Sequence, residues 1–230
     1  MENINTYTPS ATQDVAERQQ RVLRNTYALL AASMVPTVLG ALLGVQMKFS
    51  FFAGSPFIGF LLFLGVAFGF MYGIERTKNS GMGVALLLGF TFFMGLMLSR
   101  ILQAALGFSN GGTLIAMAAG GTGAIFCALA GVASTTKRDF SNIGKFLFAG
   151  VILLLLAAAA NIFFQVPALS LAISAIAIVL FSGYILYDIN RIVHGGEDNY
   201  ISATLSVYLS IYNIFVSLLQ LLMAFTGDRD

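Results

Sequence analysis

The stretch YDINRIVHGGEDNY, residues 187–200, holds the side chains of this chain that are best suited to proton transfer or metal binding. It contains Asp188, Glu197 and Asp198, which are three of the ten acidic residues, and His194, which is the only histidine. Carboxylates and imidazoles are common general acids, general bases and metal ligands in proteins. The sequence therefore raises the question of why so apolar a chain gathers these groups in one place.

Asp188 differs from the other acids of this stretch because it directly follows an apolar segment. At that position it is either a solvated group at a helix end or a buried acid. A carboxylate at the C-terminus of a helix faces an unfavourable helix dipole, so we expect a cation to accompany it. Arg76 and Arg191 are the candidate ion-pair partners, provided that the inner ends of the helices converge.

Several enzyme classes are excluded by the residues that the chain lacks. With its one histidine in a connecting loop, neither a two-histidine metal site nor a serine and histidine pair within the membrane can be built. The sequence contains no G-x-S-x-G motif and no Walker lysine motif. The single cysteine, Cys127, lies in an apolar run and can form no internal disulfide. The sequence therefore predicts no catalytic residue, no metal site and no cofactor.

A second group of polar residues lies in the last apolar segment. It consists of Ser206, Ser210, Asn213, Ser217 and Gln220, which we call the polar stripe. Successive spacings of four, three, four and three residues place all of them on one face of a helix. Because an unpaired hydroxyl or amide is unfavourable in hydrocarbon, we expect the polar stripe to face the protein interior. There it either forms interhelical hydrogen bonds or lines a hydrated path.

The composition is that of an integral membrane protein. Of the 230 residues, 58% are hydrophobic and only 10% are charged, whereas soluble domains have about 25% charged residues. The net charge of +2 is small and the basic residues are scattered, which argues against a nucleic-acid interface. The lipid bilayer is therefore the first expected partner.

Seven segments are long and apolar enough to cross a bilayer, which takes about 20 residues. They cover residues 26–47, 56–74, 82–106, 113–134, 144–165, 167–187 and 203–225. Little more than Pro167 separates the fifth segment from the sixth, so these two should form a tight hairpin. The predicted fold is an all-α integral membrane protein with seven transmembrane helices, and the polar stripe places the seventh helix at the centre.

Lysine and arginine in the short connections indicate the orientation, because such residues stay on the cytoplasmic side. With the N-terminus inside, the inner set is Arg18, Arg21, Arg24, Arg76, Lys78, Lys137, Arg138, Lys145 and Arg191, and the outer set is Lys48 and Arg229. This bias predicts a cytoplasmic N-terminus and an external C-terminus. The domains are then a cytoplasmic segment over residues 1–25, a transmembrane domain over residues 26–225 and an external tail over residues 226–230.

Small residues recur every four positions on two of the predicted helices. They are Gly65, Gly69 and Gly73 on the second helix, and Ala119, Gly123, Cys127 and Gly131 on the fourth. Small side chains let helices in a membrane approach each other closely, and this close packing supplies their attraction. We expect both faces to pack against neighbouring helices of the same chain.

Three segments of the sequence resemble the Bax inhibitor-1 family of membrane proteins. They read TTKRDFS (135–141), ANIFFQVPALSLAIS (160–174) and SGYILYDINRIVHGGEDNYISATLSVYLSIYNIFVSLLQLL (182–222). Within the family, HGGEDNYI followed by SVYLSIYNIFVSLL is most similar to the bacterial YccA-like branch. The resemblance covers residues 20–226, and its last third is the most specific part.

The resemblance implies a seven-helix fold in which the other six helices enclose the seventh. It also implies one of two roles. Some family members are pH-sensitive calcium leak channels, gated by two aspartates that share a proton. The YccA-like branch instead binds and modulates the FtsH-type membrane protease.

Position by position, the resemblance places the first acid of the gating pair at Asp188 and the second at Ser210, where the channel-like members have an aspartate. A serine cannot share a charge-bearing proton with Asp188 and removes one negative ligand for a divalent cation, although its hydroxyl can still bond a carboxyl group. We therefore expect a non-enzymatic regulator of the bacterial inner membrane that binds an FtsH-type protease. The alternative is a leak for calcium or other cations, gated by protons at Asp188 and Ser210.

Overall fold

A computed structural model describes residues 10–49, 56–136, 138 and 140–227. Within these residues the secondary structure is entirely helical. The helices are α1 (Ser10–Gln46), α2 (Pro56–Thr77), α3 (Gly81–Leu106), α4 (Gly111–Thr135), the short 3-10 helix η1 (Ser141–Ile143), α5 (Gly144–Phe164), α6 (Pro167–Val193) and α7 (Tyr200–Thr226). Seven of these helices are long and apolar enough to span a membrane, as the sequence predicts.

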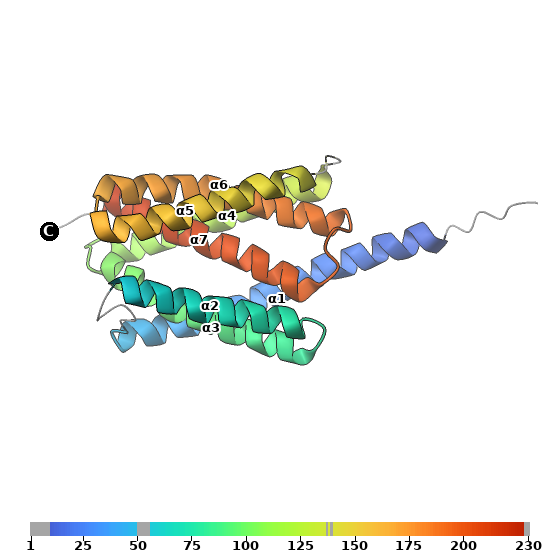
Figure 1. Cartoon of the computed structure of the whole chain (residues 1–230), viewed down its shortest axis with the longest axis horizontal. Helices are drawn as coiled ribbons and strands as arrows, with labels where there is room; N and C mark the ends of the chain where they lie inside the picture. The colour runs from blue at the N-terminus through green and yellow to red at the C-terminus, as the bar shows by residue number, and fades with distance from the viewer. Residues whose placement is uncertain (1–9, 50–55, 137, 139, 228–230) are drawn as a thin grey trace, which may run out of the picture.

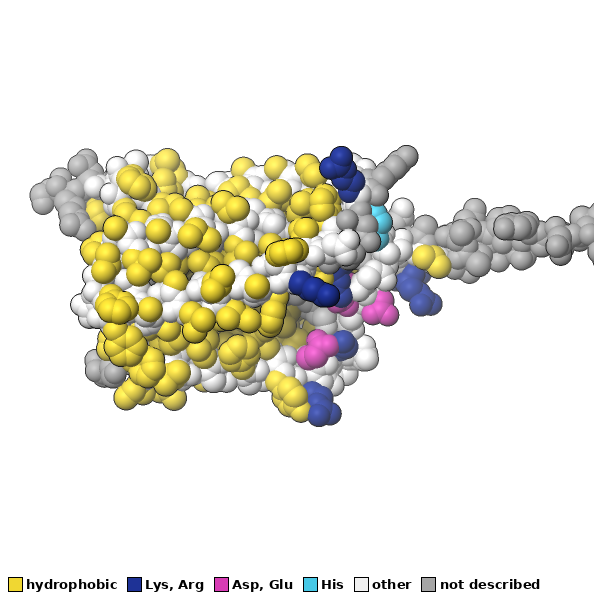
Figure 2. Space-filling view, turned by 45° about the horizontal axis from the view of Figure 1, so that its top comes forward, with side chains coloured by type: hydrophobic (Ala, Val, Ile, Leu, Met, Phe, Trp, Pro, Cys, Tyr) yellow, Lys and Arg dark blue, Asp and Glu magenta, His cyan; other side chains and the backbone are white. Residues whose placement is uncertain are grey.

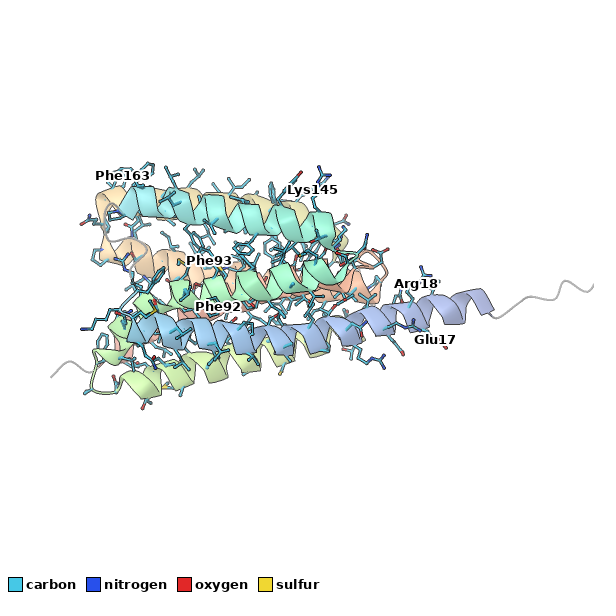
Figure 3. All side chains as sticks on the ribbon, turned by 90° about the horizontal axis from the view of Figure 1, so that it is seen from below. Glu17, Arg18, Phe92, Phe93, Lys145 and Phe163 are labelled. Atoms are coloured by element: carbon cyan, nitrogen blue, oxygen red, sulfur yellow. The ribbon has the colours of Figure 1, made fainter. Side chains whose placement is uncertain are left out.

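The first helix extends well beyond the apolar segment that begins near residue 26. It starts at Ser10 and has 37 residues, whereas about 20 are enough to cross the hydrocarbon core. Arginine is a good helix former, so the arginines before residue 26 leave the bilayer without ending the helix. The first turns of α1, with Glu17 and Arg18, therefore project beyond the rest of the bundle (Figures 1 and 3).

The last helix occupies the centre of the bundle (Figure 1). Helix α7 packs against α1, α2, α3, α4 and α6. Helix α5 does not approach α7, which corrects the expectation that six helices enclose the seventh. It packs on the outside of α6 and α2 instead, because the hairpin with α6 holds it in an outer layer.

The hairpin between α5 and α6 turns at two residues. Gln165 adopts the left-handed conformation, with φ at 51°, and Pro167 is the first residue of α6. Asn161 accepts a hydrogen bond from the backbone nitrogen of Val166 at 3.0 Å and donates to Ser170 Oγ at 2.6 Å. The tight hairpin predicted from Pro167 is thus held by its own side chains.

Helices α1 and α3 pack with their backbones close together, and this close approach depends on glycine. A side chain at Gly40 would collide with the carbonyl oxygen of Phe92, and one at Gly95 with the carbonyl oxygen of Thr37. By contrast, a side chain added at Gly65, Gly69, Gly123 or Gly131 would meet no atom within 4 Å. The expectation that the small faces of α2 and α4 pack within the chain is therefore wrong at these positions. Periodicity identified small faces but not the helices that pack closely.

Charged side chains gather at the end of the bundle from which α1 projects (Figure 2). The connections from α2 to α3, from α4 to α5 and from α6 to α7 also lie at this end, which we call the polar end. Lys145, at the start of α5, lies at the polar end, and Phe163 lies at the opposite end of that helix (Figure 3). The loop charges predict that the polar end faces the cytoplasm.

Candidate functional site

Asp188 lies within α6 rather than at its end. The helix continues to Val193, with Arg191 in its last turn, where a cation complements the helix dipole. The carboxylate is buried, with 7% of the residue exposed. Its Oδ2 atom has no hydrogen-bond partner among the described residues. An acid that ends the predicted apolar segment is therefore an enclosed group with one unbonded oxygen.

The two arginines proposed as partners of Asp188 have other contacts. Arg76 Nε donates to the Tyr72 hydroxyl at 2.9 Å, and its guanidinium lies over the Tyr72 ring. The guanidinium of Arg191 lies over the Tyr187 ring, with Nη2 3.6 Å from Glu197 Oε2. Within the described part of the chain, neither arginine forms an ion pair with Asp188.

Ser210, the other predicted gate residue, is also buried. Its hydroxyl donates to the carbonyl oxygen of Ser206, one turn earlier in α7, at 3.2 Å. No hydrogen bond joins Ser210 to Asp188, although both side chains are described. The latch suggested by the family resemblance is therefore not closed by a direct bond in this structure.

The remaining members of the polar stripe differ in their surroundings. Ser217 is buried, and Asn213 and Gln220 are half-buried. Ser206 is exposed, so the expectation that the polar stripe faces the interior is wrong at this position. Asn213 Nδ2 donates to the carbonyl oxygen of Leu209 at 2.8 Å, within its own helix. Gln220 Oε1 accepts a hydrogen bond from Ser174 of α6 at 3.0 Å. Gln220 thus makes the interhelical hydrogen bond that one reading of the stripe predicts.

Asn190 holds the connection between α4 and α5, a role that the sequence analysis missed. Its side chain is 1% exposed. Its Nδ2 atom donates to the carbonyl oxygen of Arg138 at 3.0 Å, and its Oδ1 atom accepts from the backbone nitrogen of Phe140 at 3.0 Å. His194 Nδ1 lies 2.9 Å from the carbonyl oxygen of Asn190. The only histidine thus belongs to the end of α6.

Asn199 joins the start of α7 to the connection between α2 and α3. Its Oδ1 atom accepts from the backbone nitrogens of Ile201 and Ser202, which makes it the N-cap of α7. Its Nδ2 atom donates to the carbonyl oxygen of Lys78 and to Asn79 Oδ1. An asparagine just before an apolar helix is a capping signal, so this role was detectable from the sequence.

Tyr208 links three helices near the middle of the bundle. It is 1% exposed, and its hydroxyl lies 2.9 Å from Thr37 Oγ1 of α1. The same hydroxyl donates to the carbonyl oxygen of Thr91 in α3 at 3.4 Å. Sequence spacing did not reveal this residue, because a tyrosine in an apolar helix has the pattern of an ordinary packing residue.

The hydrogen bonds of Asn190 and Asn199 form a structural network at the polar end. The Oδ2 atom of Asp188 takes no part in this network. A buried carboxyl group with an unbonded oxygen can exchange a proton or accept a hydrogen bond from a ligand. Among the described residues, no three His, Cys, Asp or Glu side chains are grouped to hold a metal ion. The arrangement around Asp188 is suited to a conformational or binding role.

Known proteins resemble this chain over almost its whole length. The model of the family described as "Inhibitor of apoptosis-promoting Bax1" matches residues 19–227. The chain is 42% identical over 202 residues to the modulator of FtsH protease YccA of Escherichia coli K12. The matched residues make up 88% of this chain and 89% of that protein. The corresponding protein of Escherichia coli O6:H1, with the same identity, is named inner membrane protein YccA. An uncharacterized protein of Neisseria meningitidis serogroup A is 39% identical over 209 residues, 90% of this chain and 92% of that protein.

Proposed function

The chain belongs to the Bax inhibitor-1 family, and on this basis we propose that it is a regulatory protein of the bacterial inner membrane that binds and modulates an FtsH-type protease. The observation that carries the proposal is the 42% identity with the Escherichia coli modulator of FtsH protease. That similarity extends over 88% of this chain and 89% of the relative. The protein itself acts without catalysing a reaction, and membrane-protein quality control is the process that it affects.

The polar end supports a regulatory role because it is a bonded unit. Asn190 fixes the connection between α4 and α5, and Asn199 fixes the connection between α2 and α3. Ser202 of α7 also donates to Glu75 of α2, which pairs with Lys78. A surface whose loops are tied to the same two helices can be recognised by a partner without first being ordered, which lowers the entropic cost of binding.

Co-purification from native membranes tests the proposal. The tagged chain is isolated in a mild detergent, and FtsH-type protease is measured by immunoblot. An unrelated seven-helix membrane protein, expressed to the same level, is the control. We expect the protease to accompany this chain and not the control. Recovery of equal amounts with both proteins, or with neither, would contradict the proposed function.

The alternative role is a pH-sensitive leak for calcium or other cations that is gated by Asp188. It is favoured by one observation, the burial of Asp188 with an unbonded Oδ2 atom. In this role Ser210, Asn213 and Ser217 line the path and proton binding at Asp188 changes its opening.

A flux assay in liposomes between about pH 6 and pH 8 tests the alternative. The Asp188→Asn variant removes the titrating group, and Asp198→Asn in the exposed loop is the matched control. The alternative predicts a calcium flux that depends on pH in the wild type and in Asp198→Asn, but not in Asp188→Asn. Identical flux from all three proteins would remove Asp188 from any gating role.

A further inference from the structure

Two helices of the bundle, α1 and α4, border α7 and meet each other at the Tyr27–Phe126 ring contact, without close approach of their backbones. No Cα atom of α1 lies within 8 Å of a Cα atom of α4 in the described residues. Between them lies a cavity of about 480 Å³ whose floor is formed by Tyr208, Ile211, Tyr212 and Phe215 of α7. We call this cavity the α1–α4 groove. It leaves part of the central helix uncovered at the depth of the membrane.

The α4 wall of the groove carries small residues beside Thr122 and Phe126. Ala119 and Gly123 line it, and both are exposed. A side chain added at Gly123 would meet no atom within 4 Å. The outer surface of α5 is different, because it exposes large apolar residues such as Phe146, Leu153 and Leu156. Large apolar side chains suit contact with lipid, whereas small ones characterise the interfaces between helices in a membrane.

The α1 wall of the groove carries larger apolar side chains. Val38 of α1 is exposed at its rim, and Leu30 and Met34 line it from the same helix. Tyr27 of α1 meets Phe126 of α4 edge to face, with ring centroids 6.0 Å apart, and limits the groove toward the polar end. The groove is therefore a bounded apolar slot rather than a continuous lipid-facing surface.

The floor of the groove carries a polar group that no described residue satisfies. Tyr212 is half-buried. Its hydroxyl forms no hydrogen bond with the described residues, unlike the neighbouring hydroxyl of Tyr208. Tyr212 lies near the middle of α7, far from the level of lipid headgroups. An acyl chain offers no acceptor there, whereas a helix can supply a serine, threonine, asparagine or glutamine side chain.

We propose that the α1–α4 groove binds a transmembrane helix of the FtsH-type protease. This inference rests on the proposed function and names the surface that serves it. The partner helix would place small residues against Ala119 and Gly123 and an acceptor side chain against the Tyr212 hydroxyl. A helix bound in the groove would cover the part of α7 that this chain leaves open between α1 and α4.

Site-specific crosslinking locates the partner. A photoreactive amino acid replaces Ala119 in the groove or, as a control, Leu153 on the lipid-facing surface of α5. After illumination of native membranes, the products are identified by immunoblot and mass spectrometry. We expect a product with the protease from position 119 and none from position 153. A product only with a second copy of this chain, or only with lipid, would overturn the assignment of the groove.

Two variants measure how much the groove contributes to binding. Gly123→Leu fills the wall, and Gly65→Leu on α2 is the matched control, because both glycines are exposed and face open space. We expect Gly123→Leu to lower co-purification of the protease at least about tenfold and Gly65→Leu to leave it unchanged. Tyr212→Phe removes only the hydroxyl and should lower recovery about three- to fivefold, whereas Tyr184→Phe on α6 should not.

The outcomes separate this inference from the proposed function. If the wild type recovers the protease and Gly123→Leu recovers it equally, the groove is not the binding surface, and the proposed function stands. If the wild type recovers no protease, both proposals fail. If Gly123→Leu does not fold, as judged by yield and gel filtration, Tyr212→Phe and the crosslinks decide. Unchanged recovery with Tyr212→Phe, together with no product from position 119, would then overturn the inference.

Discussion

Tyr208 and Asp188 are buried polar residues on two packed helices, and they differ in how far their polar atoms are hydrogen-bonded. The Tyr208 hydroxyl contacts polar groups of α1 and α3, whereas Asp188 keeps one carboxylate oxygen without a hydrogen bond among the described residues. A satisfied buried group contributes to stability, and an unsatisfied one costs free energy. Tyr208 therefore has the contacts of a structural residue, whereas Asp188 lacks a stabilising partner at one carboxylate oxygen.

Replacing Tyr208 with alanine should have the largest effect. The change removes a fully buried ring together with its contacts to Phe90, Thr37 and Thr91. We expect the free energy of unfolding in mixed micelles to fall by about 3–5 kcal/mol. Tyr72→Ala is the control, because Tyr72 is 63% exposed. A loss no larger than that of the control would show that Tyr208 does not hold α7 in place.

Replacing Asn190 with alanine should have the next largest effect. The change leaves the carbonyl oxygen of Arg138 and the backbone nitrogen of Phe140 without their partner. We expect a loss of about 1–3 kcal/mol in the free energy of unfolding and faster amide exchange in the connection between α4 and α5. Asn142→Ala, at an exposed position in η1, should change neither measurement. Equal exchange in the two variants would contradict the clamp.

Removing only the Tyr208 hydroxyl should have a smaller effect. In Tyr208→Phe the ring still fills its space, and Thr37 Oγ1 keeps its hydrogen bond to the carbonyl oxygen of Ser33. We expect a loss of about 1 kcal/mol in the same unfolding measurement. A loss as large as that of Tyr208→Ala would mean that the hydroxyl, rather than the packing of the ring, fixes the three helices.

Replacing Asp188 with asparagine should have the smallest effect on stability. No ion pair with a described residue is lost, and a charge is removed from a buried position. We expect the free energy of unfolding to stay the same or to rise by up to about 1 kcal/mol. A clear loss of stability would show that the carboxylate has a stabilising partner, and the contrast with Tyr208 would then disappear.

The positions of the helices along the chain were largely predictable from hydropathy, because about 20 consecutive apolar residues have few alternatives to a transmembrane helix. The polar ends of helices were harder to place. Helix α1 begins at Ser10, and α6 continues beyond Asp188 to Val193, because charged residues leave the bilayer without breaking helical hydrogen bonds. As a result, Asp188 lies within α6 and is buried, rather than at the end of the helix.

The candidate site was only partly predictable. Asp188 stood out by its position after an apolar run, but its surroundings depend on how helices converge, which no local pattern records. Tyr208 and Asn190 were missed for the same reason, since their partners are 171 and 52 residues away in the sequence. The small residues of α4 were recognised, but the spacing could not tell whether they face this chain or another.

The rate of proteolysis by a reconstituted FtsH-type protease tests the central claim most directly. The protease and a membrane-protein substrate are placed in liposomes with this chain or with an unrelated seven-helix protein at the same density. If the chain modulates the protease, the initial rate of substrate degradation should differ at least about twofold between the two preparations. Identical rates at saturating amounts of the chain would contradict its role as a modulator of the protease.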